Sequence, residues 1–369
     1  MKKIVVKKSV YMGFLMLFVL FLTTGCGLFQ GEQTLEEIDV PKDQSTNTET
    51  DIATDATKQT EKASESDKEG IEVTADQAET VPRELYLLNE EGLIVPQTVE
   101  LPKTDLVAQQ VLEYLIKDGP VTSMLPNGFE AVLPAGTEIN QMNIQEDGTL
   151  IVDVSEEFKE YQPEEEKNII EAMTYTLTQF DNVERVTLWI DGKEQTEMPV
   201  NGTPLKNGYS RANGINIYHP DGVDLMDSKA VTLYYPTQQN EQMYYVPVTQ
   251  YVEMDKQTDY QSMVQALLKG PAYDMDLLNV FNPNVSIKAE PSVEDGVLHV
   301  SFSKEILNDE NNASISDEVM ETLVLTLTNK EEVEAVSVEV EGVDQVFNEH
   351  GVPYTEPVTR DTFVPTGSL

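Results

Sequence analysis

The chain contains one cysteine, three histidines and one tryptophan among its 369 residues. These low counts limit how the fold can be stabilised and which kinds of functional site it can contain. A single cysteine cannot form an intramolecular disulfide, so the folded parts must be stabilised by apolar cores. The apolar run from Val10 to Leu22 is short for a membrane span and typical of an export signal. No second apolar run of membrane-spanning length occurs, so no further transmembrane helix is expected.

Basic residues are also scarce. The chain has 24 Lys and Arg against 66 Asp and Glu, which gives a formal net charge of −42. Such a surface repels nucleic acid, anionic lipid headgroups and anionic wall polymers. We therefore expect no nucleic-acid partner, and we expect any attachment to a membrane to depend on a lipid rather than on surface charge.

The N-terminal segment carries the signal for that lipid. A basic stretch, Met1 to Lys8, precedes the apolar run, and Thr23-Thr24-Gly25-Cys26 closes it with small residues. This arrangement resembles a bacterial lipobox, which implies cleavage before Cys26 and a diacylglycerol on its thiol. The usual lipobox has leucine where Thr23 stands, which puts the efficiency of processing in doubt. We expect residues 1–25 to be a lipoprotein signal peptide; the alternative is an uncleaved anchor with an incidental cysteine.

Residues 26–80 are predicted to be a disordered acidic linker. From Gly31 to Thr80 there is no aromatic residue, and Glu, Asp, Thr, Ser, Gln and Lys dominate. Such a composition cannot bury enough surface to offset the entropy of ordering. The segment is expected to hold the folded part away from the bilayer.

From Val81 onward the chain repeats itself once. Glu146-Asp147-Gly148 recurs as Glu294-Asp295-Gly296, an offset of 148, and Thr176-Leu177-Thr178 recurs as Thr326-Leu327-Thr328, an offset of 150. A period far above 50 residues indicates a duplicated domain rather than a solenoid. We place the two domains at 81–205 and 229–346, joined by a linker at 206–228 and followed by an extended C-terminal tail at 347–369.

Both copies follow the same order of local patterns. A strand leads to a first helix that should end at a Gly-Pro pair, and an Asp-Gly hairpin follows. A second helix begins at Pro163 in the first copy and near Ser316 in the second, and a final strand closes each copy. The expected fold class is α+β, with two tandem copies of a small mixed sheet, each with two helices packed on one face.

An acidic lipoprotein with this stalk and two such domains, each with a Lys-(Asp)-Gly-Pro helix end and a Glu-Asp-Gly hairpin, resembles the GerM family of sporulation and germination proteins. The resemblance covers about residues 81–346 and the leader. It implies GerMN domains, whose fold is similar to the ring-building motif of secretion-type assemblies. It also implies a non-enzymatic role in supporting the channel complex between mother cell and forespore. No catalytic residues carry over from the family.

The sequence shows no arrangement of residues that is typical of a catalytic site. The three histidines fall in different elements, His219 in the linker, His299 on a strand and His350 in the tail, and none lies in a nucleophile or HExxH setting. The adjacent carboxylates Glu156 and Glu157 should point apart. We expect no enzyme activity, no cofactor and no metal site.

Two acidic stretches leave weak calcium binding open. One contains Asp274 and Asp276, and the other runs from Asn308 to Asn312. Their oxygen-rich side chains suit calcium, but neither matches a loop of alternating ligands with a central glycine.

Three aromatic residues are candidates for contact with a partner or between the domains. Trp189 lies between inward-pointing Leu188 and Ile190, so its side chain should face outward, where the second copy has Glu339. Tyr235 and Tyr244 belong to adjacent tyrosine pairs on the first strands of the second copy, of which alternation must put some outside.

We therefore expect a lipoprotein anchored outside the cytoplasm, at the outer forespore membrane of a sporulating cell. It should act through protein partners, foremost a ring-type channel complex. The alternative functions are a cortex-peptidoglycan enzyme or its regulator, and a substrate-binding lipoprotein.

Overall fold

The structure is a computed structural model that describes residues 79–219, 228–239, 242–253, 259–330 and 332–363. These residues belong to one structural unit. The predicted signal peptide, Cys26 and nearly all of the predicted acidic linker lie outside the described residues.

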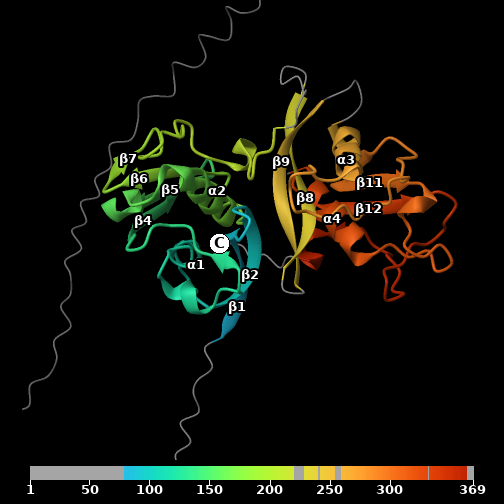
Figure 1. Ribbon diagram of the computed structural model, residues 1–369, viewed down its shortest axis with the longest axis horizontal. Coiled ribbons are helices and arrows are strands. Elements are labelled where there is room, and N and C mark those ends of the chain that lie inside the picture. Colours follow the sequence, from blue (N-terminus) through green and yellow to red (C-terminus); the bar gives the residue numbers. More distant parts are fainter. Residues whose placement is uncertain (1–78, 220–227, 240–241, 254–258, 331, 364–369) are drawn as a thin grey trace, which may run out of the picture. The chain divides into compact units, whose positions relative to one another are not determined.

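The first copy contains two sheets and two α-helices, whose arrangement can be followed in Figure 1. Its elements in chain order are β1 (Thr80–Asn89), β2 (Ile94–Pro102), α1 (Val107–Glu113), η1 (Pro120–Ser123), β3 (Phe129–Glu130), β4 (Ile139–Ile144), β5 (Thr149–Val154), η2 (Glu156–Lys159), η3 (Pro163–Glu165), α2 (Glu166–Leu177), β6 (Arg185–Ile190), β7 (Lys193–Glu194) and η4 (Arg211–Asn213). The smaller sheet has the order β2-β1-β3 and the larger has β4-β5-β6-β7. Strands β5 and β6 are parallel because α2 forms the crossover between them.

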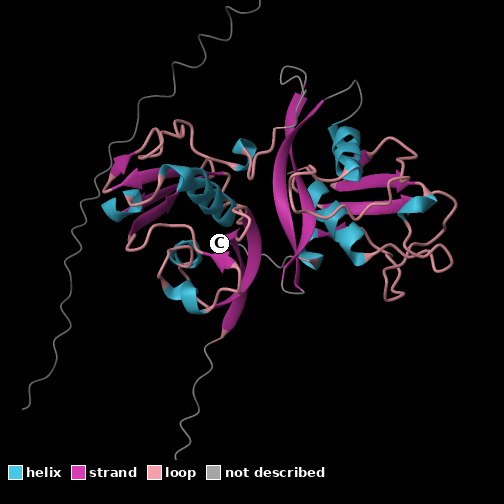
Figure 2. Ribbon diagram, in the orientation of Figure 1, coloured by secondary structure: helices cyan, strands magenta, loops and turns pink. Residues whose placement is uncertain are grey.

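The second copy repeats this arrangement with a two-stranded first sheet. Its elements are β8 (Ser228–Gln239), β9 (Gln242–Glu253), α3 (Asp259–Lys269), β10 (Ser292–Glu294), β11 (Val297–Phe302), η6 (Lys304–Ile306), α4 (Asp317–Leu327), β12 (Ala335–Val340), β13 (Val358–Thr359) and η7 (Arg360–Thr362). Strands β8 and β9 form a long hairpin, and the second sheet has the order β10-β11-β12-β13. Figure 2 shows the alternation of strands and helices in each copy. The expected α+β class is confirmed.

The hairpin turns follow from their sequences. In the second copy Glu294 pairs with Val297, so Asp295 and Gly296 are the two turn residues. Both have positive φ, 49° and 79°. A turn of this type needs positive φ at both positions, which Asp-Gly accepts more readily than most dipeptides.

The second helix of each copy starts near its predicted position and buries its apolar residues. Ser316 caps α4, with its Oγ accepting a hydrogen bond from the Val319 N–H at 3.2 Å. In the first copy Pro163 opens the short turn η3 that leads directly into α2. Apolar residues of both helices, and Phe180 just after α2, are buried: Ile169, Ile170, Met173, Leu177, Phe180, Val319, Met320, Leu323, Val324 and Leu327.

The predicted end of the first helix needs correction in one of the two copies. In the second copy α3 does end at Gly270, which has a φ of 85°. In the first copy α1 already ends at Glu113, well before Gly119, because Ile116 leaves the helical path to form a bridge with Leu133. The Gly-Pro pair therefore ends the helix in one copy only.

The ends of both copies are also more ordered than their composition indicates. Within the predicted linker, Tyr209 forms an antiparallel bridge with Val186. Within the predicted tail, Val358 pairs with Val336 in the same way, as part of β13. Each copy therefore closes with a short antiparallel pairing beyond its predicted boundary, a single bridge in the first copy and strand β13 in the second. A 3₁₀ turn that begins with arginine, Arg211 or Arg360, follows in each copy.

Candidate functional site at the domain junction

The two copies meet through their first hairpins. Strand β2 of the first copy contacts strand β9 of the second. On β1 and β8, the tyrosines Tyr86 and Tyr234 occupy matching positions and are fully buried. The backbone N–H of each donates to a helix threonine, Tyr86 to Thr176 and Tyr234 to Thr326, both at 3.0 Å. The junction therefore contains the same strand-to-helix contact twice.

An arginine packs over each tyrosine. The Arg211 guanidinium lies 4.6 Å from the ring centre of Tyr175 and 5.9 Å from that of Tyr86. It donates to the Tyr175 carbonyl at 3.2 Å and to the Thr178 hydroxyl at 2.9 Å. It also reaches the second copy, where it donates to Asn329 Oδ1 at 3.4 Å. Arg211, which lies in η4, thus joins the C-terminal end of α2 to the residues just after α4.

Arg360 takes the corresponding place in the second copy. Its guanidinium lies 5.0 Å from the ring centre of Tyr234. It donates to the Tyr234 hydroxyl and to the Leu325 carbonyl, both at 3.1 Å. The cationic side chain over a ring face is a favourable arrangement, and more so when it is shielded from water.

The tyrosines differ in acidity although their positions match. Burial, with a smaller contribution from Glu84, raises the pKa of Tyr86 well above its ordinary value. Burial acts in the same direction on Tyr234, but the charges of Arg360 and Arg211 outweigh it and lower the pKa of that hydroxyl. The charges of Arg211 and Arg360 therefore act on both tyrosine hydroxyls.

Asn216 links three parts of the junction. Its Oδ1 accepts from the Ile94 N–H at 2.8 Å, and its Nδ2 donates to the Ile94 carbonyl at 2.7 Å. The same Nδ2 donates to the Pro247 carbonyl on β9 at 2.8 Å. The backbone N–H of Asn216 donates to Glu171 on α2 at 3.0 Å. The segment between the domains is thus bonded to both of them.

A carboxylate with a raised pKa lies at this contact. Glu171 is 3% exposed, and its burial raises its pKa to about 7, against smaller opposite effects of the Asn216 N–H and of Lys167. The matching residue of the second copy, Glu321, also has its pKa raised to about 7, by burial first. Both groups change their charge near neutral pH.

The three aromatic candidates lie in different environments. Tyr244 is at the junction: its hydroxyl accepts from Asn89 Nδ2 at 3.2 Å, and its ring meets Phe129 edge-on at 5.2 Å. Tyr235 is 1% exposed and donates to the Gly270 carbonyl at 3.3 Å, so it belongs to the core of the second copy. Trp189 is half-buried on β6, between Asp153 of β5 and Glu194 of β7.

A pocket of about 310 Å³ opens beside the buried tyrosines and is lined by both copies. From the first copy it has Glu84 and its strand neighbour Thr98. From the second copy it has residues of β9, of α4 and of the C-terminal segment: Met243, Tyr244, Tyr245, Asp317, Glu318, Glu321, Leu325 and Phe363. The pocket combines aromatic walls with four carboxylates.

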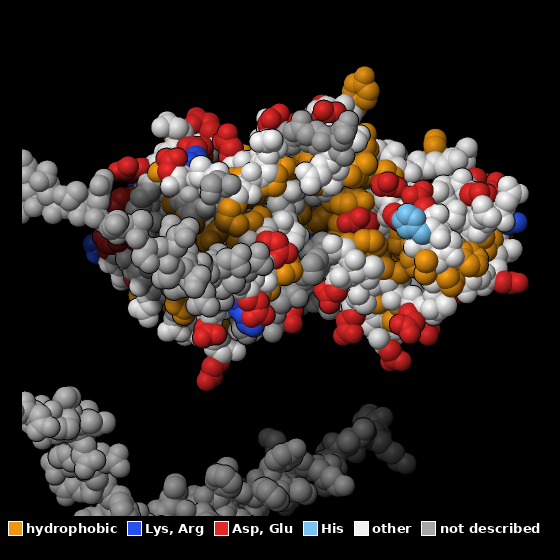
Figure 3. All heavy atoms as spheres, turned by 90° about the horizontal axis from the view of Figure 1, so that it is seen from below, with side chains coloured by type: hydrophobic (Ala, Val, Ile, Leu, Met, Phe, Trp, Pro, Cys, Tyr) orange, Lys and Arg blue, Asp and Glu red, His pale blue; other side chains and the backbone are white. Residues whose placement is uncertain are grey.

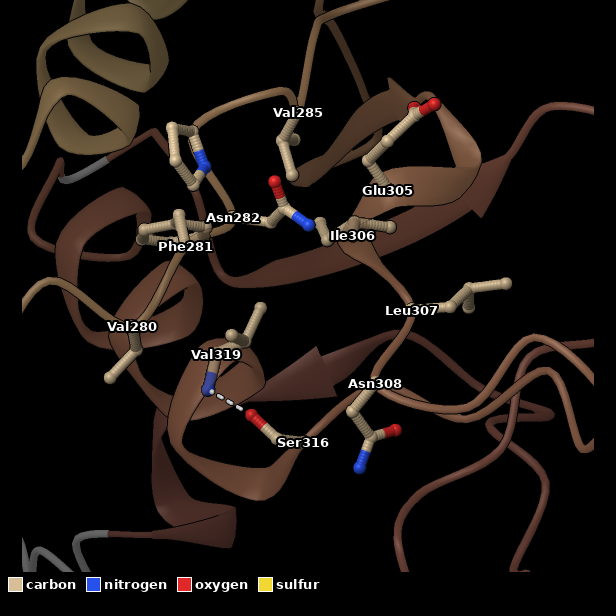
Figure 4. Close-up of a pocket in the computed structure, with 11 residues that line it drawn as sticks. Val280, Phe281, Asn282, Val285, Glu305, Ile306, Leu307, Asn308, Ser316 and Val319 are labelled. Atoms are coloured by element: carbon tan, nitrogen blue, oxygen red, sulfur yellow. Dashed lines mark hydrogen bonds between the residues drawn. The ribbon is translucent and has the colours of Figure 1, made fainter.

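A second hollow, of about 500 Å³, lies within the second copy. Figure 4 shows side chains of the segment before β10, of η6 and of the start of α4 around it. In the first copy Phe158, at the place of Ile306, packs edge-on against Tyr161 and is fully buried. The hollow therefore lies where the second copy has Ile306 in place of the larger Phe158 of the first copy.

The buried carboxylate of Glu166 has a structural role. It accepts hydrogen bonds from the Tyr161 hydroxyl, from the hydroxyl and N–H of Thr203, and from the N–H groups of Val200 and Asn201. Burial tends to raise its pKa, but these donors outweigh burial and lower it. These hydrogen bonds hold the loop after β7 against the start of α2.

The residues weighed for chemistry are dispersed in the part of the chain that the structure describes. His219 stacks on Tyr251 with ring centres 5.4 Å apart, and His350 lies 3.6 Å from Asp317. The Asp309 carboxylate accepts from the N–H groups of Asn311 and Asn312 within its own turn. Over the described ranges, no group of three potential metal ligands is found.

The same ranges contain no helix long and apolar enough to cross a membrane.

Sequence reasoning missed Arg211, Arg360 and Asn216. A signal for the arginines exists, because Ser210-Arg211 and Thr359-Arg360 form a further short repeat, but it lies outside the predicted domain boundaries. Asn216 has a φ of 47°, which suits asparagine better than most residues, yet nothing in its neighbourhood in the sequence identifies its partners.

Comparison with known proteins agrees with this architecture. A family model described as "Germane: Sporulation and spore germination" matches residues 84–196 and 232–346. The spore germination protein GerM of Bacillus subtilis (strain 168) is 43% identical over 352 residues, which are 94% of this chain and 95% of that protein. The solved tandem GerMN domains of the sporulation protein GerM from Bacillus subtilis match with a TM-score of 0.72 and 43% identity, over 78% of this chain and 100% of that one.

The described residues are thus a pair of tandem GerMN domains. The chain belongs to the GerM family of sporulation and germination proteins.

Proposed function

We propose that the protein is a non-enzymatic assembly factor that stabilises the channel complex between mother cell and forespore. The observation that carries the proposal is the junction. Arg211 and Asn216 each bond to both copies, so the two domains act as one docking body rather than as two modules on a flexible tether. A rigid body with two related domains can bridge neighbouring subunits of an assembly.

Trp189 indicates which face would dock. The face of the sheet β4-β5-β6-β7 that carries it is half-buried, whereas the matching residue of the second copy, Glu339, is exposed. A large aromatic side chain in this position suits the centre of a protein interface. The domains would thus share a fold but differ in the surface that they offer.

The proposal includes a lipid anchor on Cys26, at the outer forespore membrane. The acidic surface supports it, because a chain with this charge is repelled by anionic headgroups and needs another means of attachment. Figure 3 shows one face of the described residues, on which acidic side chains far outnumber basic ones. Replacing Cys26 by serine should abolish lipid labelling and release the protein from the membrane fraction.

The test is crosslinking in sporulating cells that carry the full chain with a C-terminal tag, followed by purification and mass spectrometry. Specific recovery of channel components by the wild type, and their loss from the Trp189→Glu variant, is the expected result. The exposed Glu156→Gln serves as the matched control and should recover the same partners. Recovery of wall-processing enzymes alone, or of no protein partner, would contradict the proposal.

A further inference from the structure

Glu84 is an unusual residue of the junction pocket. It is 2% exposed, yet no described residue donates a hydrogen bond to its carboxylate or forms an ion pair with it. The Arg360 guanidinium attracts the charge of Glu84, but its hydrogen bonds go to the Leu325 carbonyl and the Tyr234 hydroxyl. Burying a carboxylate without a hydrogen-bonded partner is unfavourable.

Helix α4 faces Glu84 across the pocket with three more carboxylates. Asp317 and Glu318 have an internal explanation, because acidic residues in the first turn stabilise a helix. Glu321 does not share it, since it lies one turn further on. The carboxylates of Asp317 and Glu318 also repel its charge, which adds to the effect of burial on its pKa. Stabilisation of the N-terminus of α4 therefore accounts for Asp317 and Glu318, but not for Glu84 and Glu321.

We propose that this pocket binds an arginine side chain from a basic segment of a partner protein. Glu84 from the first domain and Glu321 from the second would accept its N–H groups, and the tyrosines of β9 would pack against its plane. A guanidinium suits such a place better than an ammonium, because it is planar, donates in several directions and stacks on aromatic rings. The site is distinct from the Trp189 face and does not depend on the role proposed above.

The walls of the pocket support a side chain rather than a metal ion. Tyr244, Tyr245, Leu325 and Phe363 are too apolar to replace a hydration shell, but they suit the methylene stem of an arginine. A volume of about 310 Å³ lies at the lower end of the range for ligand pockets and accommodates one such group.

The experiment is calorimetric titration of the full chain, in nonionic detergent, with the peptide acetyl-Gly-Gly-Arg-Gly-Gly-amide. The comparison peptide carries citrulline, which has almost the same shape without the charge. We expect the arginine peptide to bind and the citrulline peptide to bind at least about tenfold more weakly. Glu84→Gln and Glu321→Gln should each weaken the arginine peptide about tenfold.

Controls separate the site from general attraction to an acidic surface. Glu156→Gln changes the net charge equally on an exposed turn of the first copy and should leave the affinity unchanged. If Glu84→Gln lowers the melting temperature, Glu318→Gln, on the less buried side of the pocket, supplies a second test. Equal binding of the two peptides, equal effects of Glu84→Gln and Glu156→Gln, or no binding at millimolar peptide would overturn the proposal.

Discussion

Asn216 satisfies both backbone hydrogen-bonding groups of Ile94, accepting from its N–H at 2.8 Å and donating to its carbonyl at 2.7 Å. An amide side chain here does what a neighbouring strand would do for the edge of β2. Because Asn216 occupies both backbone groups of Ile94, another strand cannot pair with β2 at that residue.

Asn216→Ala should destabilise the junction by about 2–3 kcal/mol, because three hydrogen bonds are lost and alanine is disfavoured at positive φ. Urea unfolding measures the change. Asn216→Gly separates the two effects, since glycine accepts the backbone angle and should lose less stability. The exposed Asn284→Ala is the control and should unfold like the wild type. A wild-type midpoint for Asn216→Ala would show that the bonds contribute nothing.

Arg360→Met should cost about 2–3 kcal/mol, since it removes a cation over an aromatic ring and leaves the Leu325 carbonyl without its donor. Arg360→Lys should recover only part of this loss, because an ammonium lacks the planar fork. Thermal unfolding provides the comparison. Arg185→Met, which changes a partly exposed arginine paired with Glu184, should have a much smaller effect. Similar losses for both variants would mean that the place over Tyr234 is not special.

Glu171 should make the protein less stable as pH rises. Its pKa is raised from 4.5 to about 7 in the folded state, so folding favours the protonated form. The stabilisation is fully present below about pH 4.5 and is lost as pH rises through about 7, by up to about 3 kcal/mol. Glu171→Gln should therefore match the wild type in acid and exceed it in urea stability above neutral pH. A constant difference between the two proteins at all pH values would refute this assignment.

Trp189→Glu places in the first copy the residue that the second copy carries at the matching position. If Trp189 contacts only a partner, the melting temperature should change little, since surface substitutions usually alter stability by less than about 0.5 kcal/mol. Circular dichroism measures the melting temperature, and the crosslinking assay measures the recovery of partners. Lower stability with partner recovery intact would instead show that the face is covered within the chain.

Binding of the arginine peptide should strengthen with pH. Glu321, with a pKa of about 7, is flanked by Asp317 and Glu318 on its own helix, Tyr245 on β9 and Arg360 of the C-terminal segment, and faces Glu84 on β1. Deprotonation of Glu321 supplies an acceptor with full charge, so the affinity should rise between about pH 6 and about pH 8. In Glu321→Gln this rise should disappear. A profile that is unchanged in the variant would assign the titration to another group.

Features that depend on neighbouring residues could be predicted from the sequence. The Asp295-Gly296 turn and the Ser316 cap each involve contacts within a few positions. The repeat itself was visible because turn and core residues recur at nearly constant offsets. These local rules were sufficient to predict the fold class, and the family followed from the resemblance of the repeated motifs to known proteins.

The junction could not be predicted in the same way. Arg360 meets a tyrosine more than a hundred positions away, and only the pairing of β13 with β12 brings it there. Glu84 is a charged residue on a strand, for which exposure is the ordinary expectation, and its burial depends on how the second domain packs. The Gly and Asn content of the connecting segment predicted only a linker, whereas the positive φ values of Gly208, Gly214 and Asn216 belong to ordered turns.

The position of Arg360 near the end of the sequence also determines when the junction can be completed during synthesis. The first domain can fold as soon as it emerges, with the side of strand β2 that will contact β9 still uncovered. Tyr234 follows well over a hundred residues later, and Arg360 comes later still. An apolar, partly charged surface is thus exposed for the whole time in which the second domain is made, and this is the interval in which a chaperone or a premature partner could bind it.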